Sequence, residues 1–158
     1  MCANPGRANA VQGFTMIELI TVMILLGIIA AVAMPRFASR GDFDVLGFRQ
    51  QTMQALRFAQ KTAIAKRRPV CVSQTAGALT LTFADAYGAA ACNTAVLNPA
   101  TGSAYLQPVP SGVGITALNF TYDPLGRPSF GAAQTLNVTS SGATTQSIVI
   151  EAETGYVR

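Results

Sequence analysis

One acidic side chain lies inside the most apolar stretch of the sequence. Residues 14–34 (FTMIELITVMILLGIIAAVAM) carry a single charge, Glu18, and the nearest cations are Arg7 before the stretch and Arg36 after it. A helix of about 20 apolar residues spans about 30 Å, the thickness of a hydrocarbon core. An ionised carboxylate costs about 2.5–3.5 kcal/mol at the centre of a membrane and less near its surface, and such residues are usually functional and paired. Glu18 is therefore a candidate functional residue that needs a cationic partner.

Three interpretations of this segment compete. A secretory signal peptide has an apolar run of about 7–15 residues and a small-residue cleavage site, whereas this run is longer and no clean A-x-A follows it. A plain transmembrane anchor fits the length but leaves Glu18 unexplained. Cleavage between Gly13 and Phe14 would create an α-ammonium group just ahead of Glu18. Helices stacked with a small axial offset could then pair that ammonium with a neighbour's carboxylate.

The other residue types exclude most kinds of catalytic site. The chain has no His, which excludes His-dependent catalytic triads and His-based zinc sites, and it has only 7 Asp and Glu. Glu151 and Glu153 alternate along an expected strand and are interpreted as solvated, and Ser140 lies in an expected turn with no base to activate it. No Gly-rich phosphate loop is present. We therefore expect no enzymatic activity, no cofactor and no metal site.

The elements that position these residues predict an α+β protein. Residues 42–66 are expected to form an amphipathic helix with Leu46, Met53 and Leu56 on its apolar face, ending before Pro69. The hydrophobic period then changes from 3.6 to 2, which predicts a β-rich head. Strands are expected at 70–73, 79–83, 114–122, 134–139 and 147–151, and residues 85–112 are expected to be mainly a loop with one short strand near 104–107. The second half of one long N-terminal helix would pack on this head.

The stretch Gly13-Phe14-Thr15-Met16-Ile17-Glu18-Leu19 closely resembles the class III leader of type IV pilins and type II secretion pseudopilins. The resemblance implies that a prepilin peptidase cuts after Gly13 and N-methylates the new terminal Phe14. It also implies that Glu18 supports filament assembly and that Pro35 kinks the long helix. One departure is that Val11 and Gln12 are neutral, whereas these leaders are usually more basic next to the Gly.

The head resembles the GspH/FimT group of minor pilins. Three segments carry the resemblance: LRFAQKTAIA at 56–65 with the strand Val70-Cys71-Val72 after it, FTYDPLGR at 120–127, and IVIEAETGYVR at 148–158. Within the group, the R-x-A-Q-x-x-A stretch followed by a Cys-bearing strand most resembles MshC-type minor pilins of mannose-sensitive haemagglutinin (MSHA) pili. Together with the leader, the resemblance covers most of the chain except residues 85–112.

Two cysteines are expected to remain after processing. Cys2 lies in the leader and would be discarded, which leaves Cys71 and Cys92. In a head exported to an oxidising compartment an even number of cysteines favours a disulfide, and closing a loop of about 20 residues is worth about 3 kcal/mol. Two buried free thiols are the alternative.

A basic head raises the question of DNA binding. The formal net charge is +4, with 11 Lys and Arg against 7 Asp and Glu. FimT-type pilins of the resembling group bind DNA through a C-terminal G-R-x-R motif, where this chain has Gly155-Tyr156-Val157-Arg158. Tyr156 offers a stacking surface but removes one cation, and with it a phosphate contact. Arg127 could add to a patch with Tyr156 and Arg158, although a solvated loop end is the simpler interpretation.

The resemblance implies a type IV pilin-like fold with four parts: a leader at 1–13, a transmembrane or filament-core helix at 14–34, an amphipathic helix at 35–68 and a β-rich head at 69–158. The expected function is that of a minor pilin of an MSHA-type pilus that helps assembly or adhesion. The implied partners are other pilins, prepilin peptidase and inner-membrane lipid, with the head in the periplasm before the subunit enters the filament. A FimT-like DNA-binding pilin and an H-type pseudopilin of type II secretion are the alternatives.

Overall fold

The structure is a computed structural model of the 158-residue chain. It describes residues 13–37, 40–86, 88–89, 91–140 and 145–158, with backbone only for 34–37 and 40–42. The chain divides into two compact units, Met1–Ser39 and Arg40–Arg158, and each is described by itself. Of the expected leader at 1–13, all but Gly13 lies outside the described residues.

The first unit contains one helix, α1 (Met16–Phe37). Thr15 caps it, because its Oγ1 accepts a hydrogen bond from the backbone N–H of Glu18 at 3.3 Å. The stretch Met16–Ala33 is long and apolar enough to cross a membrane, and none of it is buried within the protein. The helix includes Pro35, and the kink expected there stays a prediction. Most of the apolar stretch identified in the sequence thus forms a helix, and its surface over Met16–Ala33 is available to lipid or other helices.

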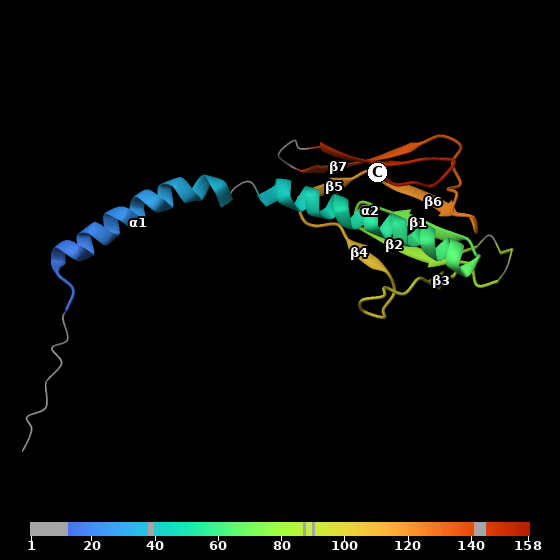
Figure 1. The fold of residues 1–158 in the computed structure, drawn as a ribbon, viewed down its shortest axis with the longest axis horizontal. Coiled ribbons are helices and arrows are strands. Elements are labelled where there is room, and N and C mark those ends of the chain that lie inside the picture. The colour runs from blue at the N-terminus through green and yellow to red at the C-terminus, as the bar shows by residue number, and fades with distance from the viewer. Residues whose placement is uncertain (1–12, 38–39, 87, 90, 141–144) are drawn as a thin grey trace, which may run out of the picture. The chain divides into compact units, whose positions relative to one another are not determined.

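The second unit begins with α2 (Arg40–Lys66), which crosses the head in Figure 1. The helix ends where it was expected to, since Arg67 adopts a left-handed φ of 51° and the Arg68 N–H donates to the Ala63 carbonyl. Its buried face differs from the predicted one. Val45 and Phe48 are buried, whereas Leu46 is 47% exposed, so the prediction that Leu46 belongs to the apolar face was wrong.

The strands in the described part of the chain form two antiparallel sheets. The first sheet has the order β3-β2-β1-β6, with β4 also paired to β2, and the second has the order β5-β7-β8. The bounds are β1 (Val70–Gln74), β2 (Ala78–Phe83), β3 (Thr94–Ala95), β4 (Leu106–Pro108), β5 (Val113–Ile115), β6 (Leu118–Tyr122), β7 (Gln134–Ser140) and β8 (Thr145–Ile150). Since α2 contacts strands of both sheets, it joins them into one head.

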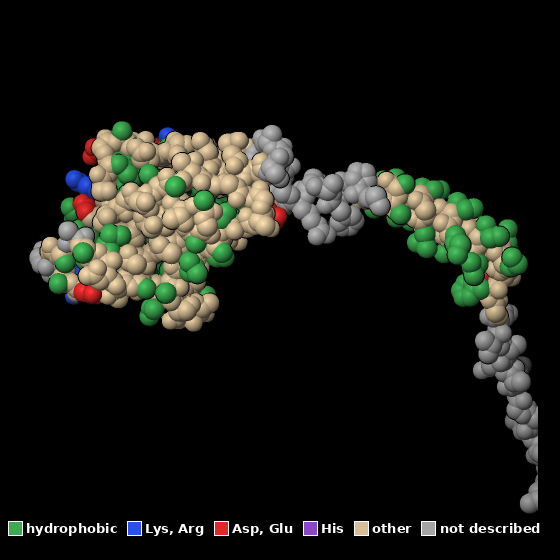
Figure 2. Space-filling model, turned by 180° about the vertical axis from the view of Figure 1, so that it is seen from behind, with side chains coloured by type: hydrophobic (Ala, Val, Ile, Leu, Met, Phe, Trp, Pro, Cys, Tyr) green, Lys and Arg blue, Asp and Glu red, His purple; other side chains and the backbone are tan. Residues whose placement is uncertain are grey.

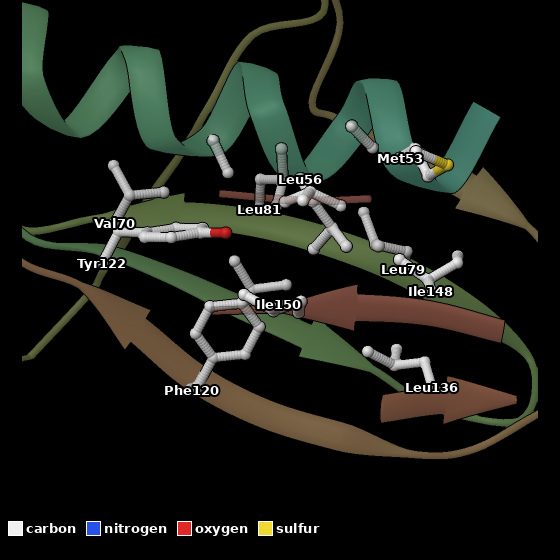
Figure 3. Packing of buried hydrophobic residues seen from close by; sticks show 14 of the residues in the cluster. Met53, Leu56, Val70, Leu79, Leu81, Phe120, Tyr122, Leu136, Ile148 and Ile150 are labelled. Carbon is white, nitrogen blue, oxygen red and sulfur yellow. The ribbon is translucent and has the colours of Figure 1, made fainter. Parts of the chain in front are cut away.

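The core of the head lies between α2 and the two sheets. Leu56 on α2 meets Leu81 and Tyr122 of the first sheet and Ile148 of the second in one cluster (Figure 3). The alternating burial along β1 and β2 matches the period of 2 that predicted these strands. The core therefore depends on α2 as much as on either sheet.

One sequence-based expectation about the strands was wrong, and another was incomplete. The single strand expected at 114–122 is two strands, because β5 pairs with β7 while β6 pairs with β1, so the chain changes sheets between Ile115 and Leu118. The region 85–112 also carries more structure than one short strand. It contains β3 as well as β4, and a bridge joins Leu97 to Ala104.

Candidate functional site

Glu18 lies in the first turn of α1 with its side chain exposed. Thr15 and Glu18 match the S/T-x-x-E pattern of a capping box, in which the acidic residue also suits the positive end of the helix dipole. The large side chains around it are exposed, including Phe14 at 81% and Met16 at 84%, and Figure 2 shows hydrophobic side chains along α1. The sequence analysis missed the cap at Thr15, although the T-x-x-E spacing signals it. The cap thus holds the backbone of Glu18, and the Glu18 carboxylate remains available to a partner.

The two cysteines of the head form a disulfide. Cys71 lies on β1 and Cys92 lies in the segment before β3, and their Cα atoms are 6.0 Å apart. The bond ties the long connection between β2 and β3 to the centre of the first sheet. It closes a loop over a sequence separation of 21, as expected from the spacing of the two residues.

The C-terminal segment folds back on β8. Val149 and Arg158 exchange backbone hydrogen bonds in both directions, at 2.7 and 3.0 Å, and Ile150 pairs with Val157. The Arg158 guanidinium contacts the Glu151 carboxylate at 2.9 Å. One of the three candidate DNA-binding residues therefore already has an acidic partner.

Two turns meet at the end of the head where the candidate residues lie. The turn at Gly126 and the turn at Gly155 are in contact, because a Cβ added at Gly155 would lie 2.4 Å from the Gly126 carbonyl oxygen. Gln60 of α2 holds both turns, since its Nε2 donates to Gly126 O at 3.0 Å and to Thr154 O at 2.7 Å. The backbone there leaves no room for a side chain at Gly155.

This contact brings the three candidate residues of the head to one region. Arg127 and Tyr156 directly follow the two touching glycines, and Tyr156 is 57% exposed. The backbone N–H of Arg127 donates to the Asp123 carboxylate at 2.8 Å, which places a second acid beside the patch. The sequence singled out these residues and marked Gln60 only as part of the R-x-A-Q-x-x-A stretch. The role of Gln60 in holding the two turns was not predicted, because its partners lie 66 and 94 residues away.

Among the described residues, no group of three or more His, Cys, Asp or Glu side chains could hold a metal ion. An apolar cavity of about 470 Å³ lies between α2 and the β3 region, and the Lys66 ammonium at its edge is 4.3 Å from the centre of the Phe83 ring. A smaller polar pocket of about 240 Å³ lies between α2 and the segment 98–108.

Comparison with known proteins bears on both units. Residues 8–34 match the prokaryotic N-terminal methylation motif. The fold matches the crystal structure of the type IV minor pilin FimU of Pseudomonas aeruginosa (strain PAO1), with a TM-score of 0.55 and 14% sequence identity over 77% of this chain and 90% of that one. No curated protein matches the sequence. The chain thus carries the N-terminal methylation motif together with the fold of a type IV minor pilin.

Proposed function

We propose that the protein is a minor pilin: a structural subunit that is cut after Gly13, N-methylated at Phe14 and incorporated into a type IV-like filament. The observation that carries the proposal is the methylation motif at residues 8–34, which contains the apolar stretch Met16–Ala33 of α1, none of it buried within the protein. An apolar helix exposed on all sides is unfavourable in contact with water, so lipid or other helices must cover it. In the proposed cycle lipid covers α1 first, while the head lies in the periplasm, and neighbouring pilins cover it in the filament.

Glu18 has the central role in this mechanism. Its carboxylate is exposed in the first turn of α1, where the backbone is fixed by the Thr15 cap. A cut after Gly13 leaves an ammonium group on Phe14, which is the nearest cation that a stacked subunit would offer. Because an unpaired charge is costly in an apolar environment, each subunit would settle at the axial offset that pairs the two groups. Prepilin peptidase, lipid and other pilins are therefore the proposed partners.

We assign the filament to the MSHA type on the head's resemblance to MshC-type pilins, with a role in assembly or adhesion. The R-x-A-Q-x-x-A stretch begins at Arg57, and the disulfide at Cys71 lies in the strand that follows it. An H-type pseudopilin of type II secretion has the same general architecture, so the neighbouring genes distinguish the two: pilus genes support this assignment, and secretin and secretion genes contradict it.

DNA uptake is the second candidate, because Arg127 and Tyr156 lie at the same end of the head. Against it, Arg158 is paired with Glu151 at 2.9 Å and Asp123 contacts the backbone of Arg127. These acids lower the local positive potential on which phosphate binding depends. The expected result of a gel shift at several salt concentrations is no retardation of DNA. Retardation that weakens with salt would favour the FimT-like alternative.

The experiment that tests the assembly role separates the charge of Glu18 from the capping of α1. Glu18→Gln keeps a side chain suited to a capping box but removes the charge, and Glu18→Ala removes both. Thr15→Ala is the matched control, since it deletes the capping oxygen and leaves the charge. Each variant is expressed in the native host, and its abundance in the membrane and in sheared filaments is measured by immunoblot.

We expect all three variants to insert normally into the membrane. Both Glu18 variants should be absent from filaments, whereas Thr15→Ala should be incorporated, because the charge and not the cap selects the neighbour. Incorporation of Glu18→Gln at the wild-type level would contradict the role given to the carboxylate.

A further inference from the structure

A polar pocket on the head is lined by an unusual number of side-chain amides. It has a volume of about 240 Å³ and lies between α2 and residues of β4 and of the segment that leads into it. Gln51 and Gln54 of α2 line it from one side, and Asn98 and Gln107 line it from the other. None of its lining residues carries a charge.

The floor of the pocket joins α2 to β4. The Gln107 amide nitrogen lies 3.4 Å from the Thr52 hydroxyl, and both residues are buried. The Gln107 carboxamide oxygen is also buried and has no hydrogen-bond partner among the described residues. An unsatisfied buried acceptor costs about 1–3 kcal/mol. A small turn of this amide toward the pocket would let a bound hydroxyl group satisfy the oxygen.

The remaining amides keep hydrogen-bonding groups for a ligand, and that of Asn98 is also held in place. Gln51 and Gln54 are three residues apart on α2, so they are neighbours on the helix surface, and both are exposed. Asn98 accepts a hydrogen bond from the Ala100 N–H at 2.9 Å, which orients its amide and leaves its two donors for a ligand. Each amide can offer both a donor and an acceptor to one partner.

An aromatic wall completes the pocket. The Tyr105 ring lines it and stacks on Phe58, with ring centres 5.7 Å apart and planes at 26°. The Phe58 ring lines the neighbouring apolar cavity, so the Tyr105 ring is supported from behind. A rigid ring beside several amides provides an apolar face and a polar edge within one small space.

We propose that this pocket binds a neutral sugar unit of a glycan. Vicinal hydroxyl groups both donate and accept hydrogen bonds, as carboxamides do, and the C–H face of a sugar ring suits an aromatic wall. An anionic ligand would call for Arg or Lys, and neither lines the pocket. The volume lies below the range of about 300–1,000 Å³ for drug-sized ligands, which favours a single ring at the end of a longer chain.

A peptide strand fits this site less well than a sugar. β4 pairs with β2 along one edge, and the Val109 N–H donates to Gly77 O on that side. By the alternation of a strand, the nitrogen of Pro108 faces the open edge, and it carries no hydrogen. Only the Leu106 N–H remains there as a donor over the three residues of β4. An added strand would therefore gain little along this edge.

Sugar binding rests on the proposed pilin function in one respect: that function places the head on a surface filament, where the pocket would contribute to adhesion. The test uses the full chain, ¹⁵N-labelled, in a detergent without a sugar headgroup. Neutral disaccharides of glucose, galactose, mannose and N-acetylglucosamine are titrated, with sialyllactose as the anionic comparison and an extended neutral peptide as the alternative ligand. The side-chain amide signals of Gln51, Gln54 and Asn98 report binding at the pocket in the wild type, and the signal of Asn98 reports it in variants that replace the two glutamines.

We expect at least one neutral disaccharide to shift these signals at millimolar concentration or below. The double variant Q51E/Q54E should weaken that binding at least tenfold, because each change replaces two donors with a charge. Q50E is the matched control: it makes the same change on an exposed residue of α2 outside the pocket and should leave binding unchanged.

The proposal is overturned if no neutral sugar shifts these signals, if Q51E/Q54E binds as tightly as the wild type, or if only the anionic sugar or the peptide binds there. These outcomes leave the pilin assignment untouched, since the processing of Gly13 and the incorporation of Glu18 variants test it separately.

Discussion

Replacing Gly155 by alanine should destabilise the head strongly, because two independent costs fall on one residue. Gly155 has a φ of +65°, a conformation that costs an L-residue about 1–2 kcal/mol. A Cβ there would also lie 2.4 Å from Gly126 O, 2.7 Å from Gln60 Nε2 and 2.9 Å from a carbon of the Tyr122 ring. Relieving such overlap by backbone shifts typically costs about 1–3 kcal/mol more. We expect Gly155→Ala to lower the free energy of unfolding by about 2–5 kcal/mol.

Gly102→Ala is the matched control for the backbone cost alone. Gly102 has a φ of +69°, close to that of Gly155, but a Cβ there would meet nothing within 4 Å. The control should therefore lose only about 1–2 kcal/mol. The difference between the two variants measures how tightly the Gly126 turn, the Gly155 turn and Gln60 fit together.

Urea unfolding of the full chain, followed by tyrosine fluorescence, provides the assay. The chain has no Trp, and its tyrosines all follow residue 86, so the signal reports the head and not α1. If Gly155→Ala and Gly102→Ala differ by less than about 0.5 kcal/mol, the two turns do not pack as described. The shared location of Arg127 and Tyr156 would then lose its basis.

Four further outcomes are expected. Replacing both Cys71 and Cys92 by serine should lower the free energy of unfolding by about 3 kcal/mol, and reductant should reproduce the loss in the wild type but not in the variant. Burial raises the pKa of Tyr122 well above its usual range, so as the pH rises this phenol ionises in the unfolded chain before it ionises in the folded head. The stability of the head should therefore fall as the pH rises past about 10. The Tyr122 hydroxyl has no hydrogen-bond partner among the described residues. Tyr122→Phe should therefore be at least as stable as the wild type in urea and should lose less stability at alkaline pH. A clear destabilisation would contradict the absence of a partner for this hydroxyl. A bulkier residue at Gly13, such as Gly13→Leu, should block processing and leave a precursor band of unshifted mobility on a gel, so a mature-sized band would count against cleavage at this position.

Local patterns in the sequence predicted the elements well but not the face of α2. The buried positions Val45, Phe48, Thr52 and Leu56 follow a helical period, yet Thr52 is polar and interrupts the apolar pattern. Its burial depends on Gln107, which is 55 residues away in sequence and lies in a region that gave no clear pattern. A partner of this kind is set by tertiary packing, so it could not be read from the helix alone.

The same limit explains the divided strand at 114–122. Alternation continues through Thr116, and the local period gives no sign that the chain leaves one sheet for the other. The Thr116 N–H donates to Asn137 O at 3.0 Å, so Thr116 is still bonded to β7 of the second sheet. Two residues later the chain enters β6, which pairs with β1 of the first sheet. Only the pairing partners, not the alternation, decide where the strand divides.

Some of the candidate sites could likewise be predicted from local sequence, and others could not. Gly13, Phe14 and Glu18 lie within seven residues whose types and order carry their own signal, and the matched motif covers them. The disulfide between Cys71 and Cys92 followed from a count of cysteines. The contacts of Gln60 and the amide pocket are assembled from distant segments, so the local sequence does not predict them.

The central claim is that cleavage after Gly13 frees the amine that neutralises Glu18 in an assembled filament. Mass spectrometry of the protein isolated from its native host tests this claim most directly. The account predicts a chain that begins at Phe14 and carries one methyl group on its terminal nitrogen. An intact amino terminus at Met1, in protein recovered from membranes or filaments, would contradict it.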